Sequence, residues 1–525
     1  MPSLLARLSH AAPWLIAALA LGARLLPTPR TIDDAFITFR YARNLLDGLG
    51  FVYNAGEPVL GTTTPLYTLL MAALAGLTGW RDFPWLALIV NAPADAITCL
   101  LLLRLGHTLT GHSAVGLAAA LLWAVAPMSV TFAIGGMETS VFILLLVLSA
   151  DLYLGGRYRG AAFVAALLLL TRPDGVLFAG LLGLDLVWRS WRAQRNVPWR
   201  EAAIFLLTLT PWVLFAWWTF GSPIPHSVAA KTEAYRLDAG SALIRLIQHY
   251  STPFFENEFL GRGWQLAGVF VYLFLTLTAG LNASRRDTRT WPLALYPWLY
   301  FIVFAAANPL IFRWYLAPPL PFFFLFILSG LWQLAEHFSR LLMRFRPQLS
   351  TLNLQSATFF LPPSLFLLPS SFFLFTSLAA WTLRPDHGPQ WPAPQMAWHA
   401  LELLYTEVGK DMAGQVAPQR TVIAAGDIGA LGYYSDAQML DTVGLISPQA
   451  TAYFPLDPDV YAMVYAVPPQ LILDERPDYA VFLEIYVRNG LLRDARFQAE
   501  YTLLKKIPTD IYGSEGMLVF KRTRP

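Results

Sequence analysis

The sequence has little charge and almost no cysteine. Only 14% of its 525 residues are Asp, Glu, Lys or Arg, against roughly 25% in soluble domains, and 56% are hydrophobic. The single cysteine, Cys99, lies within an apolar run, which excludes a disulfide within the chain and a zinc site built from cysteines. The sequence also has no P-loop, no plausible dinucleotide-binding fingerprint and no His or Cys pattern with metal-ligand spacing. We therefore expect an integral membrane protein that requires no bound nucleotide or metal cluster.

Apolar runs that approach the length needed to cross a bilayer recur along most of the chain. We expect about eleven transmembrane helices, near residues 11–28, 85–104, 113–134, 138–155, 160–171, 175–190, 201–220, 264–282, 291–309, 316–335 and 357–381. The N-terminal run imitates a secretory signal, but we expect it to stay uncleaved as the first span because further spans follow it.

The basic residues predict the orientation of these spans, because cytoplasmic loops are enriched in Lys and Arg. With the N-terminus inside, four arginine clusters face the cytoplasm: Arg157 and Arg159; Arg189, Arg192, Arg195 and Arg200; Arg285, Arg286 and Arg289; and Arg340, Arg344 and Arg346. This orientation requires the apolar run 62–79 to be an interfacial helix and not a span. It places the loops 29–84 and 221–263 and the C-terminal tail on the extracytoplasmic side.

The C-terminal tail differs in composition from the rest of the chain. Its charge density is ordinary, and strand-like runs occur at 421–425, 479–486 and 517–521. We expect a transmembrane domain at 1–383, with its first outer loop at 29–84, and an extracytoplasmic α/β domain at 384–525. A Pro- and Trp-rich stretch at 384–394 is interpreted as the linker, and the prolines of the last span predict a kink or a late start.

One outer segment, residues 31–44, concentrates the candidate chemistry. Two adjacent acids, Asp33 and Asp34, directly follow the first span. One stripe of an amphipathic helix then follows, formed by Ala35, Phe39, Ala42 and Leu46. Such a helix lies along the bilayer surface, where a lipid-borne substrate carries its head group. A structural alternative stays open, because Thr31 and Asp34 also have the spacing of a capping box.

A membrane enzyme without nucleotides can use a lipid phosphate as the activated group of its substrate. Transfer of a sugar from that phosphate needs a carboxylate that accepts the proton of the attacking hydroxyl, and cations that hold the phosphate. The outer loops supply Asp33 or Asp34 as the base, and as candidate phosphate ligands Arg40, Arg43, Arg172, His226, Lys231 and Arg313. Each cation also has a structural explanation: a solvated helix face, a loop or turn, an interfacial anchor or, for Arg172, a pair with Asp174. Together, Asp33, Asp34 and Glu57 also invite a divalent cation, and the need for one stays open.

Three acids lie inside predicted spans, where ionisable residues are functional candidates by default. Asp151 and Asp185 lie toward the span ends, and we expect Arg157 and Arg189 as their partners. For Asp95, which lies deeper, the sequence indicates no partner.

Several outer segments resemble one known family. Residues 33–44 (DDAFITFRYARN), 50–57 (GFVYNAGE) and 61–67 (GTTTPLY) resemble the first outer loop of GT-C superfamily glycosyltransferases, and are most similar to bacterial polyprenyl-phosphate-dependent arabinofuranosyltransferases and mannosyltransferases. Residues 136–139, 171–175 and 225–231 resemble later blocks of these proteins, so the likeness covers about residues 1–335. It implies a multi-pass α-helical GT-C-like fold with interfacial helices in the first outer loop, and a base at Asp33 or Asp34, of which Asp33 is favoured. We expect substrate contacts from Tyr41, Arg43, Glu57, Glu138 and Asp174.

The sequence therefore predicts an inverting glycosyltransferase of the cell membrane. Its donor would be a polyprenyl-phosphate sugar, and its acceptor a glycan, lipid or protein outside the cytoplasm, with membrane lipids but no nucleic acid as partners. A lipid-linked oligosaccharide ligase or polymerase stays open as an alternative, and so does a receptor whose tail is the functional part. A transporter or flippase also stays open, although only Asp95 resembles the mid-bilayer polar groups that such a protein needs.

Overall fold

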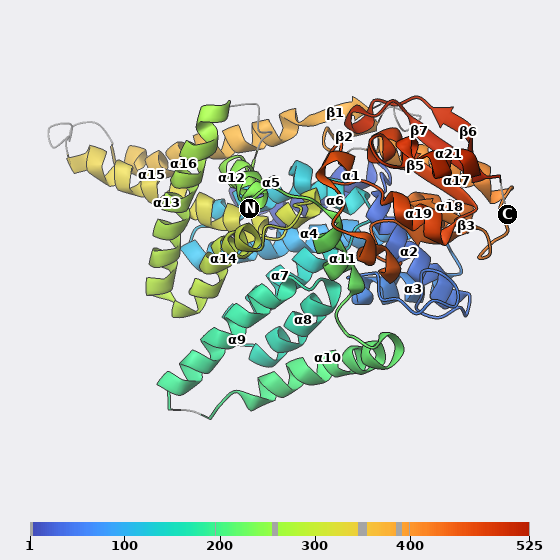
Figure 1. Ribbon diagram of the computed structural model, residues 1–525. Coiled ribbons are helices and arrows are strands. Elements are labelled where there is room, and N and C mark those ends of the chain that lie inside the picture. Colours follow the sequence, from blue (N-terminus) through green and yellow to red (C-terminus); the bar gives the residue numbers. More distant parts are fainter. Residues whose placement is uncertain are drawn as a thin grey trace. The chain divides into compact units, whose positions relative to one another are not determined.

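The chain folds into two compact units, each assembled from segments far apart in sequence (Figure 1). The computed structural model describes residues 4–194, 196–254, 261–344, 354–384, 391–397 and 399–523. The helical unit contains residues 1–30, 87–209 and 242–397, and the mixed unit contains residues 31–86, 210–241 and 398–525. Arg195, Arg346 and residues 385–390 of the expected linker lie outside the described residues.

The helical unit consists of helices that coincide with the predicted spans. In order, these are α1 (Leu4–Leu25), α4 (Phe83–Thr110), α5 (Ser113–Val125), α6 (Pro127–Ile134), α7 (Thr139–Leu154), α8 (Tyr158–Thr171), α9 (Gly175–Arg192), α10 (Trp199–Phe220), α13 (Arg262–Arg286), α14 (Trp291–Ala307), α15 (Leu320–Arg344) and α16 (Leu354–Ala379). The shorter elements of this unit are α12 (Ser241–Ser251), the 3-10 turns η1 (Thr288–Thr290) and η2 (Arg313–Leu316), and the strands β1 (Trp381–Arg384) and β2 (Trp391–Pro394). The chain passes from one unit to the other within α4, after Leu86, and again within α10, after Leu209.

Six helices of the described chain are long and apolar enough to cross a membrane, which supports the predicted membrane protein. They are Phe83–Thr110, Trp199–Phe220, Gly263–Arg286, Thr288–Ala307, Arg313–Leu342 and Pro362–Ala379. The pair α5 and α6, bent by 45° at its break, would make a seventh. The predicted total of about eleven spans stays a prediction, since α7, α8 and the apolar part of α1 are shorter.

The acid for which the sequence offered no partner, Asp95, holds an ion pair in the core of the helical unit. Arg24 of α1 donates from Nε to Asp95 Oδ2 over 2.8 Å, and both side chains are buried. Trp123 and Ser140 donate to the same carboxylate over 3.2 and 2.9 Å. The Arg24 guanidinium also donates to Ala20 O, Ala124 O and Ser129 Oγ. Asp95 therefore joins α1, α4, α5 and α7, which removes the observation that favoured a transporter.

We predict that Asp95→Ala lowers the free energy of unfolding by about 3–5 kcal/mol, because it leaves the Arg24 guanidinium buried without a counterion. The double variant Arg24→Met/Asp95→Leu should lose much less, since no charge is then buried alone. Thermal unfolding of the purified protein measures both. Arg81→Ala is the control, because the Arg81–Asp47 pair is exposed and such pairs contribute about 0–1 kcal/mol. Equal losses in all three variants would contradict a structural role for the buried pair.

The other two intramembrane acids have the partners that the sequence predicted. Arg189 lies 2.6 Å from Asp185, and Arg157 lies 3.5 Å from Asp151. Asp151 also pairs with Arg104 over 3.2 Å, and Asp185 accepts hydrogen bonds from Tyr153 and Trp291. All three acids of the predicted spans are thus neutralised within the helical unit.

The mixed unit combines residues 31–86, which the sequence assigned to the first outer loop, with residues 210–241 and the C-terminal tail. Its helices are α2 (Asp33–Leu46), α3 (Pro65–Thr78), α11 (His226–Ala234), α17 (Ala400–Ala413), α18 (Gly429–Ser435), α19 (Pro469–Glu475), α20 (Glu484–Val487) and α21 (Ala495–Glu500). Its strands are β3 (Val422–Ala425), β4 (Gln438–Asp441), β5 (Tyr479–Leu483), β6 (Tyr501–Ile507) and β7 (Met517–Arg522). Four 3-10 turns complete it: η3 (Pro448–Tyr453), η4 (Pro458–Val460), η5 (Leu491–Arg493) and η6 (Ile511–Gly513).

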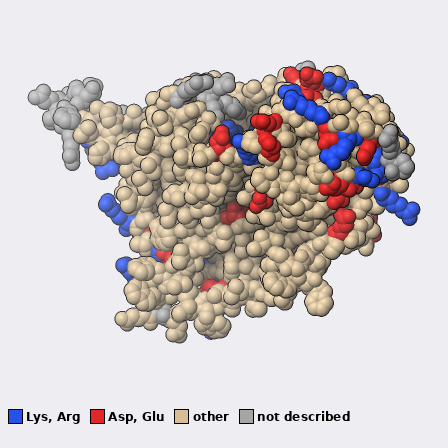
Figure 2. Space-filling model, viewed as in Figure 1, with Lys and Arg blue, Asp and Glu red and all other residues tan. Residues whose placement is uncertain are grey.

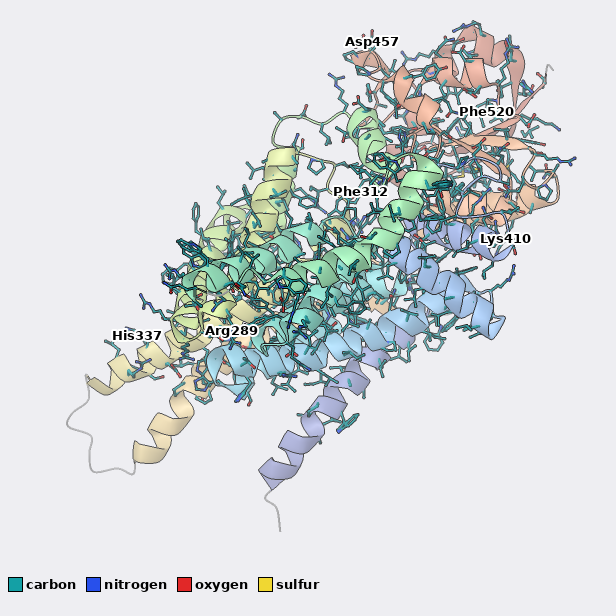
Figure 3. The ribbon with its side chains drawn as sticks, turned by 90° about the horizontal axis from the view of Figure 1, so that it is seen from below. Arg289, Phe312, His337, Lys410, Asp457 and Phe520 are labelled. Atoms are coloured by element: carbon teal, nitrogen blue, oxygen red, sulfur yellow. The ribbon has the colours of Figure 1, made fainter. Side chains whose placement is uncertain are left out.

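The five strands of the tail form one sheet in the order β4-β3-β5-β7-β6. Strand β3 runs parallel to β4 and β5, and β7 runs antiparallel to β5 and β6. Every residue of β5 is buried, as expected for an inner strand, whereas Lys505 and Lys506 mark the edge strand β6. Phe520 of β7, labelled in Figure 3, contacts Phe497 of α21 with ring centroids 5.0 Å apart. Charged side chains gather over this unit in Figure 2, as the composition of the tail predicted.

The structure has strands at all three runs predicted in the tail, but the run 479–486 is a strand only to Leu483, where the helix α20 follows. It also revises the expected linker. Strand β2 pairs with β1 in an antiparallel hairpin, so residues 391–394 and 384 are parts of strands. Residues 31–86 belong to the same compact unit as the tail, which the sequence did not predict.

Candidate functional site

Helix α2 begins at Asp33, the first of the two acids that precede the predicted stripe, and no capping box starts it. Its N-cap residue is Ile32, and no side chain caps the helix, so the Thr31–Asp34 capping box is wrong. Ala35, Phe39 and Ala42 are buried as the apolar stripe predicted. The opposite face is largely buried as well, so the solvated charged face expected for this helix is absent from most of its length.

The Asp33 carboxylate joins α2 to the C-terminal tail within the mixed unit. Its Oδ2 accepts from Gly429 N over 2.9 Å, and its Oδ1 accepts from Ala430 N over 2.8 Å. A Cβ on Gly429 would lie 1.9 Å from the Asp33 carbonyl oxygen, so only glycine permits this approach. Asp33 is 8% exposed, and both of its oxygens have backbone donors. Its carboxylate therefore holds the first turn of α18 against the start of α2.

The neighbouring acid, Asp34, remains accessible and meets a predicted cation. Its Oδ2 lies 3.5 Å from Nζ of Lys231 on α11, and the two side chains are 32% and 23% exposed. The structure thus brings together two candidates that are separated by nearly two hundred residues in the sequence. A half-exposed carboxylate beside an ammonium group can accept a proton while the cation holds an anionic substrate.

A third carboxylate, Asp427, was not among the predicted site residues. It lies in the turn between β3 and α18, which the sequence interpreted correctly as a strand-to-helix turn, and it accepts from Tyr405 Oη over 3.0 Å. Burial raises the Asp427 pKa to about 6, the Tyr405 hydrogen bond lowers it, and the negative charge of Asp34 raises it. The pKa of Asp33 is raised well above its usual value, mainly by burial and then by the negative charge of Asp427. The hydrogen bonds from the backbone of Ala430 and Gly429 act in the opposite direction and lower it. The signal that could have found Asp427 is its place at the carboxyl end of a predicted strand, where α/β sheets bind ligands.

We predict that this carboxylate cluster makes the protein less stable as the pH rises from about 4 to about 6. Because the folded-state pKa of Asp427 is raised, the native state holds a proton that the unfolded state releases near pH 4. The stabilisation that this proton provides is complete below the pKa that the carboxyl group has in the unfolded state. It is lost as the pH rises through about 6. Across this range, the melting temperature should fall less steeply with rising pH for Asp427→Asn than for the wild type. An identical slope would contradict the raised pKa.

Four other predicted residues of the first loop make structural contacts. Arg40 is fully buried and donates to the carbonyl oxygens of Tyr53, Gly432 and Ala437. Arg43 donates to Tyr433 O and to Asp436 Oδ1. The buried Tyr41 hydroxyl donates to Val59 O and accepts from Gly61 N. Glu57 accepts from the side-chain amides of Asn54 and Gln438. These contacts fold the loop onto the tail, and they give no support to a substrate contact at any of the four.

In the helical unit, three predicted residues converge. Arg172 donates from Nε and Nη2 to both oxygens of Asp174 over 3.0 Å, and from Nη1 to Glu138 over 3.2 Å. Tyr300 also donates to Asp174, over 3.1 Å. The structural pairing of Arg172 with Asp174 is thus confirmed. Arg313, by contrast, is exposed and donates to Met396 O.

His226 opens α11, five residues before Lys231, on the segment that the sequence assigned to phosphate binding. Its main-chain N donates to Leu60 O over 2.8 Å. Its Nε2 is buried without a hydrogen-bond partner within the described chain. Burial lowers the pKa of His226 below its ordinary value, so the ring is neutral at pH 7 and serves as a hydrogen-bonding group more than as a cation.

Two further features of the mixed unit bear on ligands. Among the described residues, no group of three or more His, Cys, Asp or Glu side chains is arranged to hold a metal ion, so Asp33, Asp34 and Glu57 do not form the suggested cation site.

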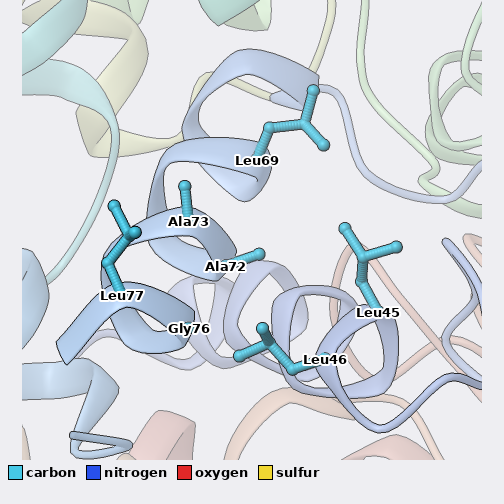
Figure 4. A pocket seen from close by; sticks show the side chains of 7 residues that line it. All are labelled: Leu45, Leu46, Leu69, Ala72, Ala73, Gly76 and Leu77. Atoms are coloured by element: carbon cyan, nitrogen blue, oxygen red, sulfur yellow. The ribbon is translucent and has the colours of Figure 1, made fainter. Parts of the chain in front are cut away.

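Between α2 and α3 lies an apolar groove of about 610 Å³ (Figure 4), lined by Leu45, Leu46, Leu69, Ala72, Ala73, Gly76 and Leu77. Such a lining contacts hydrocarbon better than it contacts polar ligands.

Comparison with known proteins gives one family model and two curated relatives, each of which matches only part of the chain. A family model described as "Domain of unknown function (DUF8728)" matches residues 395–520. Two curated relatives are terminal beta-(1->2)-arabinofuranosyltransferases, from Mycobacterium tuberculosis (29% identical over 227 residues) and Corynebacterium glutamicum (30% over 234 residues). Each match covers 38% of this chain and about a third of the relative, 35% and 33% respectively.

Solved structures show the fold of the whole chain. ArnT from Cupriavidus metallidurans, solved with undecaprenyl phosphate, aligns over 99% of this chain and 98% of its own, with a TM-score of 0.58 and 12% identity. The oligosaccharyltransferase of Archaeoglobus fulgidus aligns over 99% of this chain and 75% of its own, with a TM-score of 0.55 and 12% identity. The chain thus shares its fold, the GT-C fold, with these two structures, and its curated relatives are arabinofuranosyltransferases, as the sequence resemblance predicted.

Proposed function

We propose that the chain is an inverting membrane glycosyltransferase that moves a sugar from a polyprenyl phosphate to an extracytoplasmic acceptor. The observation that carries this proposal is the accessible Asp34–Lys231 pair at the start of α2, on a chain with the GT-C fold. The names of the curated relatives favour a pentofuranose, specifically arabinofuranose, as the transferred sugar. That ArnT was solved with undecaprenyl phosphate supports a lipid-phosphate donor.

The proposed reaction is a single displacement at the anomeric carbon of the donor sugar. The acceptor hydroxyl oxygen bonds to that carbon, and the bond from the carbon to the phosphate oxygen breaks, so polyprenyl phosphate leaves with the electron pair. The hydroxyl proton passes to a carboxylate. Because the departing polyprenyl phosphate is a weakly basic phosphate monoester, it is a good leaving group, so one base and a cation suffice, and a single attack inverts the anomeric configuration.

We assign the base to Asp34, although the sequence alone favoured Asp33. Asp33 is buried with both oxygens occupied by backbone donors, whereas Asp34 is half-exposed. Lys231 would leave Asp34 for the donor phosphate when the donor binds, so that the carboxylate gains basicity at the moment it is needed. His226 on the same helix would add a hydrogen bond to the phosphate. The groove between α2 and α3 offers apolar surface to the hydrocarbon part of the donor, about 16 Å along α2 from Asp34.

The proposal is tested with the purified full-length protein and two classes of donor. We expect transfer from a polyprenyl monophosphate that carries one arabinofuranose to an arabinan acceptor, with release of polyprenyl phosphate, and no transfer from an oligosaccharide linked through diphosphate. Mass spectrometry of the lipid and glycan products distinguishes the two. Transfer of the oligosaccharide alone would instead identify a lipid-linked oligosaccharide ligase.

A further inference from the structure

A polar cavity opens in the helical unit, between α13 and α15. At the crossing of these helices, a Cβ on Gly330 would lie 2.5 Å from Leu275 O, so the two backbones touch there. Further along, Asn282 donates to Gln333 over 2.6 Å. Beside this bond lies a wedge of about 450 Å³, lined by Thr278, Asn282, Arg285, Arg286, Gly330, Gln333, Leu334, Glu336, His337 and Arg340. Figure 3 labels His337 on α15.

The wedge carries an excess of positive charge. Three arginines line it, Arg285 and Arg286 from α13 and Arg340 from α15, against one acid, Glu336, which leaves a formal charge of +2 with His337 neutral. Glu336 already accepts from Trp332 over 2.9 Å and lies 3.1 Å from the His112 ring nitrogen. Its contacts with Arg340 are long, at 3.3 Å to the carbonyl oxygen and 3.5 Å to the carboxylate. Of the two α13 arginines, Arg286 donates to Thr110 O, and both are exposed.

The surroundings of the wedge are apolar. It lies at the ends of two of the helices that are long and apolar enough to cross a membrane. Leu334, which lines the wedge, is exposed, and so are Leu277, Leu281 and Phe338, each the sequence neighbour of a residue that lines it. A ligand of this site therefore meets guanidinium groups and a hydrocarbon-facing surface at once. A water-soluble anion would use only the first of these.

We propose that the wedge between α13 and α15 binds the phosphate headgroup of an anionic membrane phospholipid. Guanidinium groups match phosphate oxygens in charge and in hydrogen-bond geometry, and basic pockets between transmembrane helices bind anionic headgroups. The acyl chains of the lipid would lie along the exposed leucine side chains. The wedge shares no residue with the Asp34–Lys231 pair, so the proposal does not depend on the proposed glycosyltransfer.

The test compares lipid retention by the full-length protein in nanodiscs of phosphatidylcholine with and without phosphatidylglycerol, measured by native mass spectrometry. In the triple variant Arg285→Ala/Arg286→Ala/Arg340→Ala, the amount of phosphatidylglycerol retained should fall by about tenfold or more. The amount of phosphatidylcholine retained should stay the same. The matched control is Arg159→Ala/Arg192→Ala/Arg200→Ala, which removes the same charge from exposed helix ends outside the wedge. This control should retain phosphatidylglycerol like the wild type.

Several results would overturn the proposal. Equal losses in both triple variants would show an unspecific charge effect. Displacement of phosphatidylglycerol by inorganic phosphate at equal concentration would show a site for a free anion. If the triple variant fails to fold, the single variant Arg285→Ala decides, because it removes one exposed guanidinium from the wedge. Unchanged phosphatidylglycerol retention by that variant would then contradict a headgroup site.

Discussion

Asp34→Asn is expected to lower turnover of a polyprenyl-phosphate sugar by about 100- to 10,000-fold, the range over which a positioned general base contributes. The amide keeps the size of the side chain but cannot accept the acceptor's proton. Because Lys231 would still bind the donor phosphate, the KM for the donor should change little. Steady-state release of polyprenyl phosphate measures both quantities.

Two variants of the same loop serve as controls for this result. Asp33→Asn places an amide NH₂ against the backbone donors of Gly429 and Ala430, so it should lower the melting temperature as well as turnover. Asp47→Asn changes an exposed acid just after α2, which pairs with Arg81, and should leave turnover unchanged. Full turnover by Asp34→Asn, with loss of turnover but unchanged stability in Asp33→Asn, would transfer the base to Asp33.

Gly429→Ala is expected to destabilise the mixed unit by about 3 kcal/mol or more, because overpacking against rigid backbone cannot relax by a side-chain rotation. The added Cβ would lie 1.9 Å from the Asp33 carbonyl oxygen and 2.6 Å from its Oδ2. The start of α2 and the first turn of α18 would have to separate, which would also displace Asp34. We therefore expect both a lower melting temperature and lower turnover.

Gly414→Ala is the matched control in the same tail, since a Cβ there would meet nothing within 4 Å. It should leave the melting temperature and turnover close to those of the wild type. If Gly429→Ala were as stable as Gly414→Ala, the close contact between α2 and α18 could not exist as described.

The sequence predicted those features of the fold that depend on local patterns. Hydropathy located the helices of the helical unit, and the apolar runs located β3, β5 and β7. It missed β4, in which polar Gln438 and Asp441 leave an apolar run of only two residues, and β6, whose exposed lysines interrupt any apolar run. The sequence also located the helix α2 itself, because the paired acids and the helical stripe lie next to each other in the chain.

The site was predicted less completely, because its contacts join distant segments. The bond from Gly429 to Asp33 spans 396 residues, and no local pattern indicates it. Arg40 and Arg43 looked like a solvated face for the same reason, since their carbonyl acceptors lie in the tail. The partner of Asp95 was missed because Arg24 was counted as part of an apolar span.

The most direct test of the proposed site is a double-mutant cycle between Asp34 and Lys231, measured as turnover of a polyprenyl-phosphate arabinofuranose. If the two side chains serve one step, Asp34→Asn and Lys231→Met each lower turnover, and the double variant is hardly slower than the slower single variant. Turnover that falls by the product of the two single effects, or that survives both changes, would contradict a shared role at the reacting centre.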